Sequence, residues 1–207
     1  MPADEVGRDT FDYMVDRDVP HPSLTDAMGH GVAAAQLASL SVGSLRNSRR
    51  RGFGLVEQAQ LASAAIAANA APDQFITALL GRIDLATGAV EWVSAGHMNP
   101  LLVRDGQETE IALDPGLVLG VMAELNYELQ HLQLRPGDRL ALPTDGSERD
   151  AAEAGIDSLL GTSSDLHPRE TVKVLTDAVL HVTGRNLSSR VRHVGFMRSV
   201  RPPRWAG

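Results

Sequence analysis

The chain has 207 residues, 43% of them hydrophobic, which is enough for one domain with its own core. The absence of cysteine excludes disulfides, thiolate metal sites and a cysteine nucleophile, so hydrolytic chemistry would have to use oxygen or nitrogen ligands, a hydroxyl or water. The net charge of -7 argues against a nucleic-acid-binding surface, which would carry clustered excess Lys and Arg.

The N-terminal residues 1–8 carry both charge signs and no apolar stretch, so they do not resemble a secretory signal. No apolar run in the sequence approaches the roughly 20 residues of a membrane-spanning helix. We therefore expect a cytoplasmic protein that neither inserts into a membrane nor binds nucleic acid.

Three helices are predicted from the spacing of apolar residues. The first runs from Gly31 to about Arg49 and is rich in Ala, with Leu and Val on neighbouring turns. The second runs from about Leu55 to Ala71, where Pro72 stops it. The third runs from about Pro168 to Val182, and Gly184 follows as its cap.

Between the second and third helices the pattern changes to short extended segments, separated by turn dipeptides such as Asp105-Gly106. Short connections favour antiparallel pairing, and strands combined with helices predict an α+β fold in which antiparallel sheets form a sandwich covered by helices. The alternation changes phase between Leu129 and Leu132, where we expect a bulge. The predicted strands are Gln74 to Leu85, Ala89 to Ala95, Leu101 to Arg104, Glu110 to Leu113, Tyr127 to Leu134 and Arg139 to Pro143.

Three acidic clusters fall at the ends of predicted strands, at residues 7–12, 25–31 and 144–148. Carboxylates from different strands can build a two-metal site for Mg2+ or Mn2+ that activates water for phosphoester hydrolysis. Each cluster also has a simpler interpretation. Asp145 followed by glycine is a common turn, Asp26 can be solvated beside a strand-to-helix junction, and Asp9 can be a surface residue.

In their order along the chain, these segments resemble those of the PPM-type metal-dependent serine/threonine phosphatases of the bacterial SpoIIE-like branch. That family carries a Gly-Gly-Asp-x-x-Asp segment, an Asp-x-Met-Gly-His-Gly turn that opens a long helix, an Ala-Gly-His segment and a Thr-Asp-Gly-x-x-Glu segment. The resemblance covers nearly the whole chain and implies an antiparallel β-sandwich flanked by helices. The matching segments here are residues 7–12, 26–31, 95–97 and 144–148, with further similarity at 75–77 and 135–138.

The resemblance implies a role for each matching residue in a site for two Mn2+ or Mg2+ ions. Asp26 would bridge the ions, and the backbone carbonyl of Ala27 would face one of them. Asp145 would hold the second ion, Asp9 would bind an ion or orient a water on it, and Asp12 would be a helper. Asp9, Asp26 and Asp145 are therefore the expected catalytic residues, serving a water that attacks phosphorus in line.

Two histidines in the matching segments could act as general acids or metal ligands. Structural roles are favoured, because His30 lies at a turn between two glycines and His97 follows a strand end shortly before Pro100.

The sequence departs from the family at both ends. The Asp-Asp-x-Thr segment of the last core strand is absent, and Arg192 and His193 stand at roughly the acidic positions. A cation there would weaken metal binding, so one ion could be retained instead of two. Pro20 and Pro22 interrupt an expected strand, and the helix and strand that usually precede Gly7 are missing.

These departures predict a SpoIIE-like phosphatase domain at residues 1–187, short at its N-terminus, and an atypical Arg-rich tail at residues 188–207. Six of the 19 Lys and Arg residues follow Gly184, and no acid does. The expected fold is thus α+β, with the first strand of the sandwich missing and an atypical C-terminal strand.

The leading hypothesis is a phosphatase acting on phosphoserine or phosphothreonine of a regulatory protein, for which the resemblance implies an anti-anti-sigma-factor-like partner. The alternative is a catalytically impaired pseudophosphatase that binds a regulatory partner without turnover. The missing C-terminal acid favours the alternative, whereas retention of Asp9, Asp26 and Asp145 favours the enzyme. An unrelated α+β ligand-binding domain would require the ordered motifs to occur by coincidence.

Overall fold

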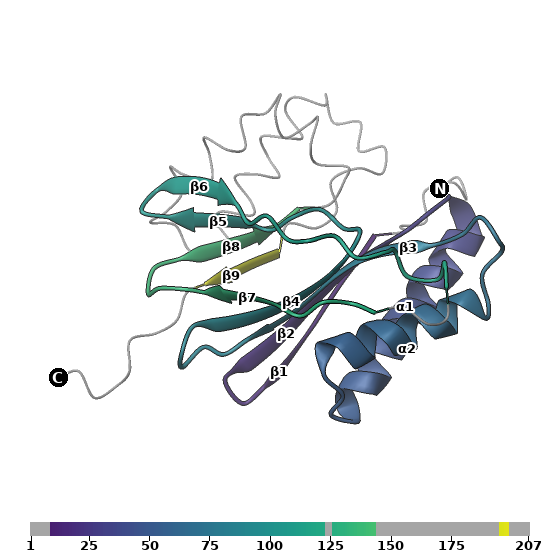
Figure 1. The fold of residues 1–207 in the computed structure, drawn as a ribbon, viewed down its shortest axis with the longest axis horizontal. Coiled ribbons are helices and arrows are strands. Elements are labelled where there is room, and N and C mark those ends of the chain that lie inside the picture. The colour runs from purple at the N-terminus through teal and green to yellow at the C-terminus, as the bar shows by residue number, and fades with distance from the viewer. Residues whose placement is uncertain (1–8, 123–125, 144–194, 199–207) are drawn as a thin grey trace. The chain divides into compact units, whose positions relative to one another are not determined.

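The structure, a computed structural model, describes residues 9–122, 126–143 and 195–198 (Figure 1). The chain divides into two compact units. The first comprises Met1–Leu85, Ala89–His97 and Leu113–Gln133, and the second comprises Ala86–Gly88, Met98–Ala112 and Leu134–Gly207.

The first unit is a five-stranded antiparallel sheet with two helices on one face (Figure 1). The strand order is β1-β2-β3-β4-β7. Side chains from α1, α2 and the facing strands form a buried hydrophobic core that includes Leu37, Leu45, Ile66, Ile76 and Val93. The elements of this unit are β1 (Asp9–Asp16), β2 (Val19–Ala27), α1 (Gly31–Arg50), α2 (Leu55–Ala67), β3 (Ile76–Ile83), β4 (Ala89–Ala95) and β7 (Gln130–Gln133).

The strand β2 is continuous through both of its prolines, so the prediction that they interrupt it is wrong. Pro20 and Pro22 lie opposite Val15 and Tyr13 of β1. The pairing of β2 with β3 covers only Ser23–Ala27. The prolines therefore occupy the half of β2 that is paired on one side, where a missing N–H breaks no ladder hydrogen bond.

The helix α1 confirms the first predicted helix to within one residue. The helix α2 begins as predicted but ends at Ala67, four residues early. There the side chain of Asn69 donates to the carbonyl oxygen of Ala65 at 2.8 Å, competing with the backbone for that acceptor. Ala71 precedes a proline, which disfavours the helical conformation.

The second unit contains an antiparallel sheet with the strand order β6-β5-β8-β9. Its strands are β5 (Leu101–Arg104), β6 (Gln107–Glu110), β8 (Arg139–Leu142) and β9 (Gly195–Arg198). The side chain of Arg104 in β5 donates to both carboxylate oxygens of Asp138, the buried residue immediately before β8. This ion pair joins the two central strands of the sheet.

Two predicted strands have different bounds in the structure. The strand expected at Glu110–Leu113 is β6, at Gln107–Glu110, because the two-residue turn at Asp105 and Gly106 places Gln107 directly opposite Arg104. The strand expected from Tyr127 begins only at Gln130, because Tyr127 is buried in the helix-covered core. The change of phase expected to mark a bulge coincides with the start of β7.

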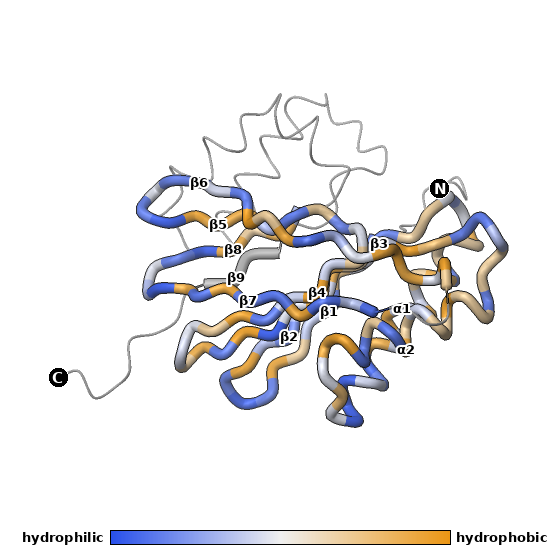
Figure 2. Tube along the Cα trace, viewed as in Figure 1, coloured by the Kyte–Doolittle hydropathy of each residue, from blue (hydrophilic) through white to orange (hydrophobic). Residues whose placement is uncertain are grey.

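Most of the other predicted strands are confirmed: β4 and β5 have the predicted bounds, and β8 ends one residue early. The strand predicted at Gln74 to Leu85 is two residues shorter at each end, as β3. Hydrophobic residues are concentrated on α2 and the central strands, and the β1–β2 and β5–β6 turns are hydrophilic (Figure 2). The predicted α+β class with antiparallel sheets and helices is confirmed.

Some expectations concern residues outside the described ranges. They are the helix at 168–182, the acidic cluster at 144–148 and the altered segment around Arg192 and His193. Among the described residues, no helix is both long and apolar enough to cross a membrane.

Candidate metal centre

The acidic residues Asp9 and Asp26 face each other across two neighbouring strands. They are Cα partners in the antiparallel ladder of β1 and β2. Directly opposed side chains of such a pair lie on the same face of the sheet, with Cβ atoms about 4.5–5.5 Å apart. Seventeen positions separate these residues in the sequence, and the β1–β2 hairpin brings them together.

The environment of this pair suits a divalent cation. Asp9 is only 8% exposed, Asp26 is half-buried, and one carboxylate oxygen of Asp26 is fully buried. Like charges directly opposite each other destabilise a sheet, and desolvation increases that repulsion. Carboxylate oxygens are the donors preferred by Mg2+ and Mn2+, so a bound cation would relieve the repulsion and use the chemistry of this donor pair.

Asp9 and Asp26 form a row of side chains across the sheet, called the acidic row below. The row continues into β3, where Thr77 is the Cα partner of Asp26. Ala27 and Ile76 alternate with these polar residues and belong to the core beneath the helices. Because successive strand residues point to opposite faces, Asp9, Asp26 and Thr77 lie on the face turned away from α1 and α2.

Ala27 is the last residue of β2 and its side chain is fully buried in the core. After it, the backbone N–H of Met28 donates to the carbonyl oxygen of Phe75 at 2.9 Å, and the chain leaves the sheet. Gly29 and Gly31 adopt φ values of 99° and 74°, which are costly for other residues, and α1 begins at Gly31. The conformation of this turn explains its two glycines.

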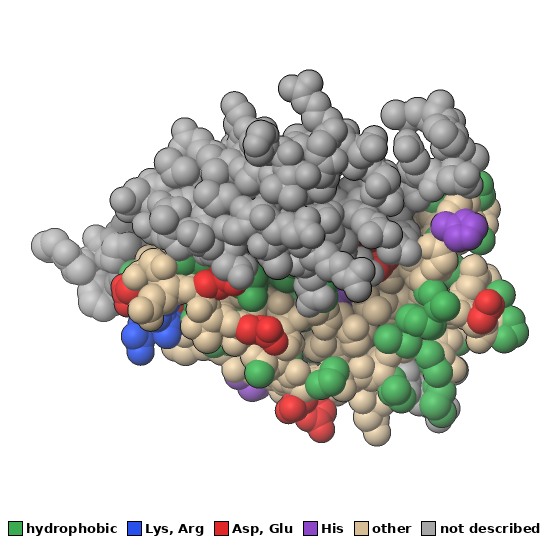
Figure 3. Space-filling view, turned by 90° about the horizontal axis from the view of Figure 1, so that it is seen from above, with side chains coloured by type: hydrophobic (Ala, Val, Ile, Leu, Met, Phe, Trp, Pro, Cys, Tyr) green, Lys and Arg blue, Asp and Glu red, His purple; other side chains and the backbone are tan. Residues whose placement is uncertain are grey.

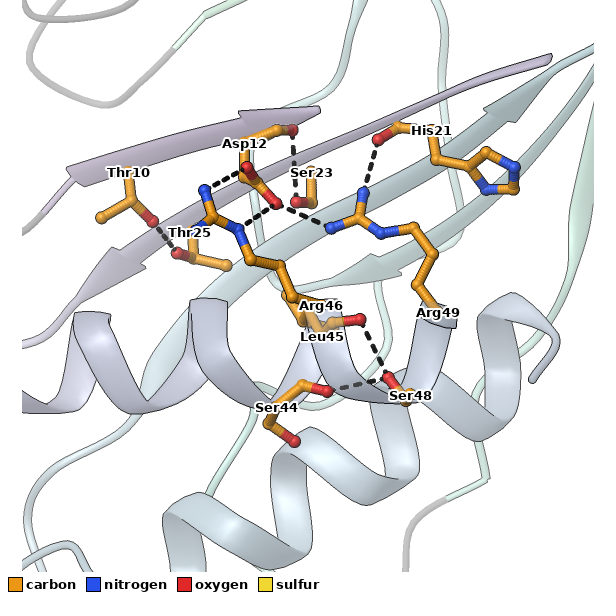
Figure 4. Close-up of polar contacts among 10 residues, drawn as sticks. All are labelled: Thr10, Asp12, His21, Ser23, Thr25, Ser44, Leu45, Arg46, Ser48 and Arg49. Atoms are coloured by element: carbon orange, nitrogen blue, oxygen red, sulfur yellow. Dashed lines mark hydrogen bonds and ion pairs between the residues drawn. The ribbon is translucent and has the colours of Figure 1, made fainter. Parts of the chain in front are cut away.

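Asp12 does not belong to the acidic row, contrary to its expected helper role. It lies three residues after Asp9, and an odd separation in a strand reverses the face. Its carboxylate accepts hydrogen bonds from Arg46 at 2.7 and 3.1 Å and from Arg49 at 2.7 Å, as Figure 4 shows. Arg49 also donates to the carbonyl oxygen of His21 at 2.8 Å. Asp12 is thus a structural residue that holds α1 against β1 and β2.

The electrostatic state of Asp12 follows from these contacts. Burial alone would raise its pKa above the usual 3.8, but the hydrogen bonds and positive charges of Arg46 and Arg49 lower the pKa more. The net pKa is lower than usual, so Asp12 is ionised at neutral pH.

The two histidines occupy different environments. His30 is exposed at the N-cap of α1 and its side chain makes no capping hydrogen bond. His97 is only 8% exposed, and its Nδ1 lies 2.8 Å from the Oγ1 of Thr77. Sequence reasoning assigned no role to Thr77, although residues 75–77 belong to a segment that resembles the family.

The expected acid Asp145 lies outside the described residues, so the structure places two of the three predicted catalytic acids. Within the described ranges, no group of three or more His, Asp or Glu side chains could hold a metal. The acidic side chains visible in Figure 3 lie at separate places. Completion of the centre therefore requires ligands beyond Asp9 and Asp26.

Comparison with solved structures assigns the fold to the PPM-type, or PP2C, phosphatases. The RsbU and RsbW domains of Rv1364c from Mycobacterium tuberculosis give a TM-score of 0.76 at 22% identity, over 98% of this chain and 58% of that one. The PP2C phosphatase domain with a fragment of the regulatory domain of SpoIIE from Bacillus subtilis gives 0.73 at 18% identity, over 92% and 57%.

The chain belongs to the SpoIIE family, because the family described as Stage II sporulation protein E matches residues 21–190. A relative in Bacillus subtilis (strain 168), the phosphoserine phosphatase RsbU, is 22% identical over 97% of this chain and 62% of its own length. The chain thus spans about three fifths of the length of these relatives.

Proposed function

We propose that this chain is a metal-dependent phosphatase that hydrolyses phosphoserine or phosphothreonine. The observation that carries the proposal is that Asp9, which is buried, lies opposite the half-buried Asp26 in a member of the SpoIIE family. Two opposed carboxylates supply the oxygen donors that a divalent cation prefers, and the fold is that of PP2C phosphatases.

Four residues would hold two Mn2+ or Mg2+ ions. Asp26 would serve both ions, and the backbone carbonyl of Ala27 would contribute to one of them. Asp9 would bind an ion or orient a water on it, and Asp145 would hold the second ion. When bound, the ions supply the acidity that makes water a nucleophile and the charge that stabilises the phosphoryl oxygens.

The proposed substrate is a phosphorylated regulatory protein similar to an anti-anti-sigma factor. The name of the relative RsbU, a phosphoserine phosphatase, supports a phosphoserine substrate. The assignment of the regulator rests on the family resemblance. We further propose that residues 1–187 form the phosphatase domain and that residues 188–207 are an atypical Arg-rich tail, of which β9 pairs with β8.

A second candidate function is a pseudophosphatase that binds the regulatory partner without turnover. It is favoured by the absence of the acidic segment expected near the C-terminus, where Arg192 and His193 stand. A cation at that position would oppose metal binding and reduce the site to one ion.

Hydrolysis of p-nitrophenyl phosphate in the presence of Mn2+ tests the two candidates. We expect Mn2+-dependent activity in the wild type and a loss of about 100-fold or more in Asp26→Asn, because the bridging carboxylate is removed. The matched control is Asp16→Asn, an exposed acid at the far end of β1 that should retain wild-type activity. Wild-type activity equal to that of Asp26→Asn would contradict the enzyme and favour the pseudophosphatase.

A further inference from the structure

The position of His97 is fixed by the glycine that precedes it. Gly96 follows β4 with φ of +69°, and it forms an isolated bridge to Ala78 of β3. A Cβ atom at Gly96 would lie 2.6 Å from the Cγ1 of Val118, closer than packed atoms can approach. Both the backbone conformation and the packing therefore require glycine, and the resulting turn buries His97 beside β3.

His97 contacts the residue that ends the acidic row. Its Nδ1 lies 2.8 Å from the hydroxyl oxygen of Thr77, which is directly opposite Asp26 in the β2–β3 ladder. Asp26 in turn is opposite Asp9. The order across the sheet is thus imidazole, hydroxyl, carboxylate, carboxylate.

The donor and acceptor properties of these groups determine which group donates a hydrogen bond to which. A threonine hydroxyl can accept one hydrogen bond while donating another, whereas an ionised carboxylate only accepts. If the Nδ1–H of His97 donates to Thr77, the hydroxyl hydrogen of Thr77 is left to donate toward Asp26. Opposed Cβ atoms about 4.5–5.5 Å apart allow that contact directly or through one water.

We propose that Thr77 and His97 are positioning residues that orient the carboxylate of Asp26 for metal binding. This inference rests on the proposed function, because it assigns Asp26 to the metal. Mutating a side chain that hydrogen-bonds to a metal ligand and orients it typically lowers metal affinity or activity by about 10–100-fold. Thr77 and His97 act here through Asp26 and need not touch the substrate.

The test is a calorimetric Mn2+ titration of the full chain, combined with p-nitrophenyl phosphate kinetics. Thr77→Val keeps the branched shape but removes the hydroxyl, so we expect Mn2+ binding to weaken about 10-fold or more, with kcat reduced and KM for the phosphate ester little changed. Thr77→Ser keeps the hydroxyl and should stay within about twofold of the wild type. His97→Ala should weaken Mn2+ binding, and the double variant should lose little more than either single one.

The matched control is Thr25→Val. Thr25 is buried next to Asp26 in sequence, but its hydroxyl lies on the helix-covered face, 2.5 Å from the hydroxyl of Thr10. A purely structural effect of losing a bonded threonine hydroxyl would lower Mn2+ affinity in both valine variants. We expect it to fall only in Thr77→Val.

Two results would overturn the inference. In the first, the wild type is active and Thr77→Val binds Mn2+ as tightly as it does. In the second, Thr25→Val weakens Mn2+ binding as much as Thr77→Val does. A wild type that neither binds Mn2+ nor hydrolyses the ester would instead remove the proposed function, and this inference with it. The behaviour of the wild type therefore distinguishes the two failures.

Discussion

At Asp12, one buried carboxylate is shared by two guanidinium groups from successive turns of α1. Arg49 is itself buried, whereas the side chain of Arg46 is more than half exposed. Removing one partner of a buried ion pair leaves the other charge without compensation. The contact fixes α1 on the sheet, close to β1 and β2, the two strands that carry Asp9 and Asp26.

The lowered pKa of Asp12 predicts a dependence of stability on pH. Because the folded pKa lies below the unfolded value, the stabilisation is fully present above the usual pKa of 3.8 and is lost as the pH falls through the folded pKa. Asp12→Asn should reduce the free energy of unfolding by about 3–5 kcal/mol at pH 7. Urea unfolding of wild type and variant at pH 7 and at pH 3 should show this difference shrinking at the lower pH.

The pH comparison has an internal control. The pKa of Asp138 is also lower than usual. Its burial raises the pKa, but the hydrogen bonds from Arg104 and from the backbone N–H of Arg135 lower it more. Asp138 therefore titrates in the same way in the wild type and in Asp12→Asn. The difference between them therefore reports Asp12. A difference in unfolding free energy that stays constant between pH 7 and pH 3 would contradict the charged role of Asp12. As a control, Asp16 is exposed, so Asp16→Asn should change the free energy of unfolding by less than about 0.5 kcal/mol.

At the scale of single residues, strand alternation determines what the sequence could reveal about the site. The odd separation of Asp9 and Asp12 already places them on opposite faces once β1 is known to be a strand. The pairing of Asp9 with Asp26 requires the register of the hairpin, which the sequence does not specify. Thr77 joins the row only through β3, which follows two helices along the chain.

At the scale of elements, α2 is tied to the segment that precedes β7. The buried hydroxyl of Ser63 accepts from the backbone N–H of Gly120 at 3.1 Å and donates to the carbonyl oxygen of Met122 at 2.9 Å. Next to it, Leu119 exchanges backbone hydrogen bonds with Ile76 at the start of β3. These contacts hold residues 119–122 between α2 and the start of β3, next to Thr77.

Gly120→Ala tests this packing. Gly120 has φ of +96°, and an added Cβ would clash with the side chain of Ile66 in α2. Gly137→Ala is the matched control, because Gly137 has φ of +98° but open space around its Cβ position. Thermal or urea unfolding should show a cost of about 1–2 kcal/mol for the backbone strain in both variants, with a further 1–3 kcal/mol for overpacking only in Gly120→Ala. Equal losses would show that the segment does not pack tightly on α2.

The helices α1 and α2 were predictable because an amphipathic pattern is local, and β4 and β5 were predictable because apolar residues and turns delimit them. The strand β6 was displaced in the prediction because Gln107–Glu110 is entirely polar, and only the geometry of the preceding turn defines it. Tyr127 has the composition of a strand residue but packs in the core, so tertiary contacts decide its conformation.

At the scale of the whole molecule, metal binding should be linked to folding. A ligand present at 100 times its dissociation constant, if it binds only the folded state, adds about 2.7 kcal/mol of stability. For a chain of this size such a gain raises Tm by roughly 5–10 °C. Thermal unfolding with and without Mn2+ should show the shift in the wild type and lose it in Asp26→Asn, whereas an equal shift in both would place the metal elsewhere.

The central question for this protein is whether Asp9 and Asp26 support turnover. The direct measurement is Mn2+-dependent release of inorganic phosphate from a phosphoserine-containing protein by the wild type, compared with Asp9→Asn and Asp26→Asn. We predict release that requires Mn2+, is abolished by EDTA, and falls about 100-fold or more in both variants. Release that is the same in all three proteins, or that persists in EDTA, would contradict the assignment of the catalytic metal to Asp9 and Asp26.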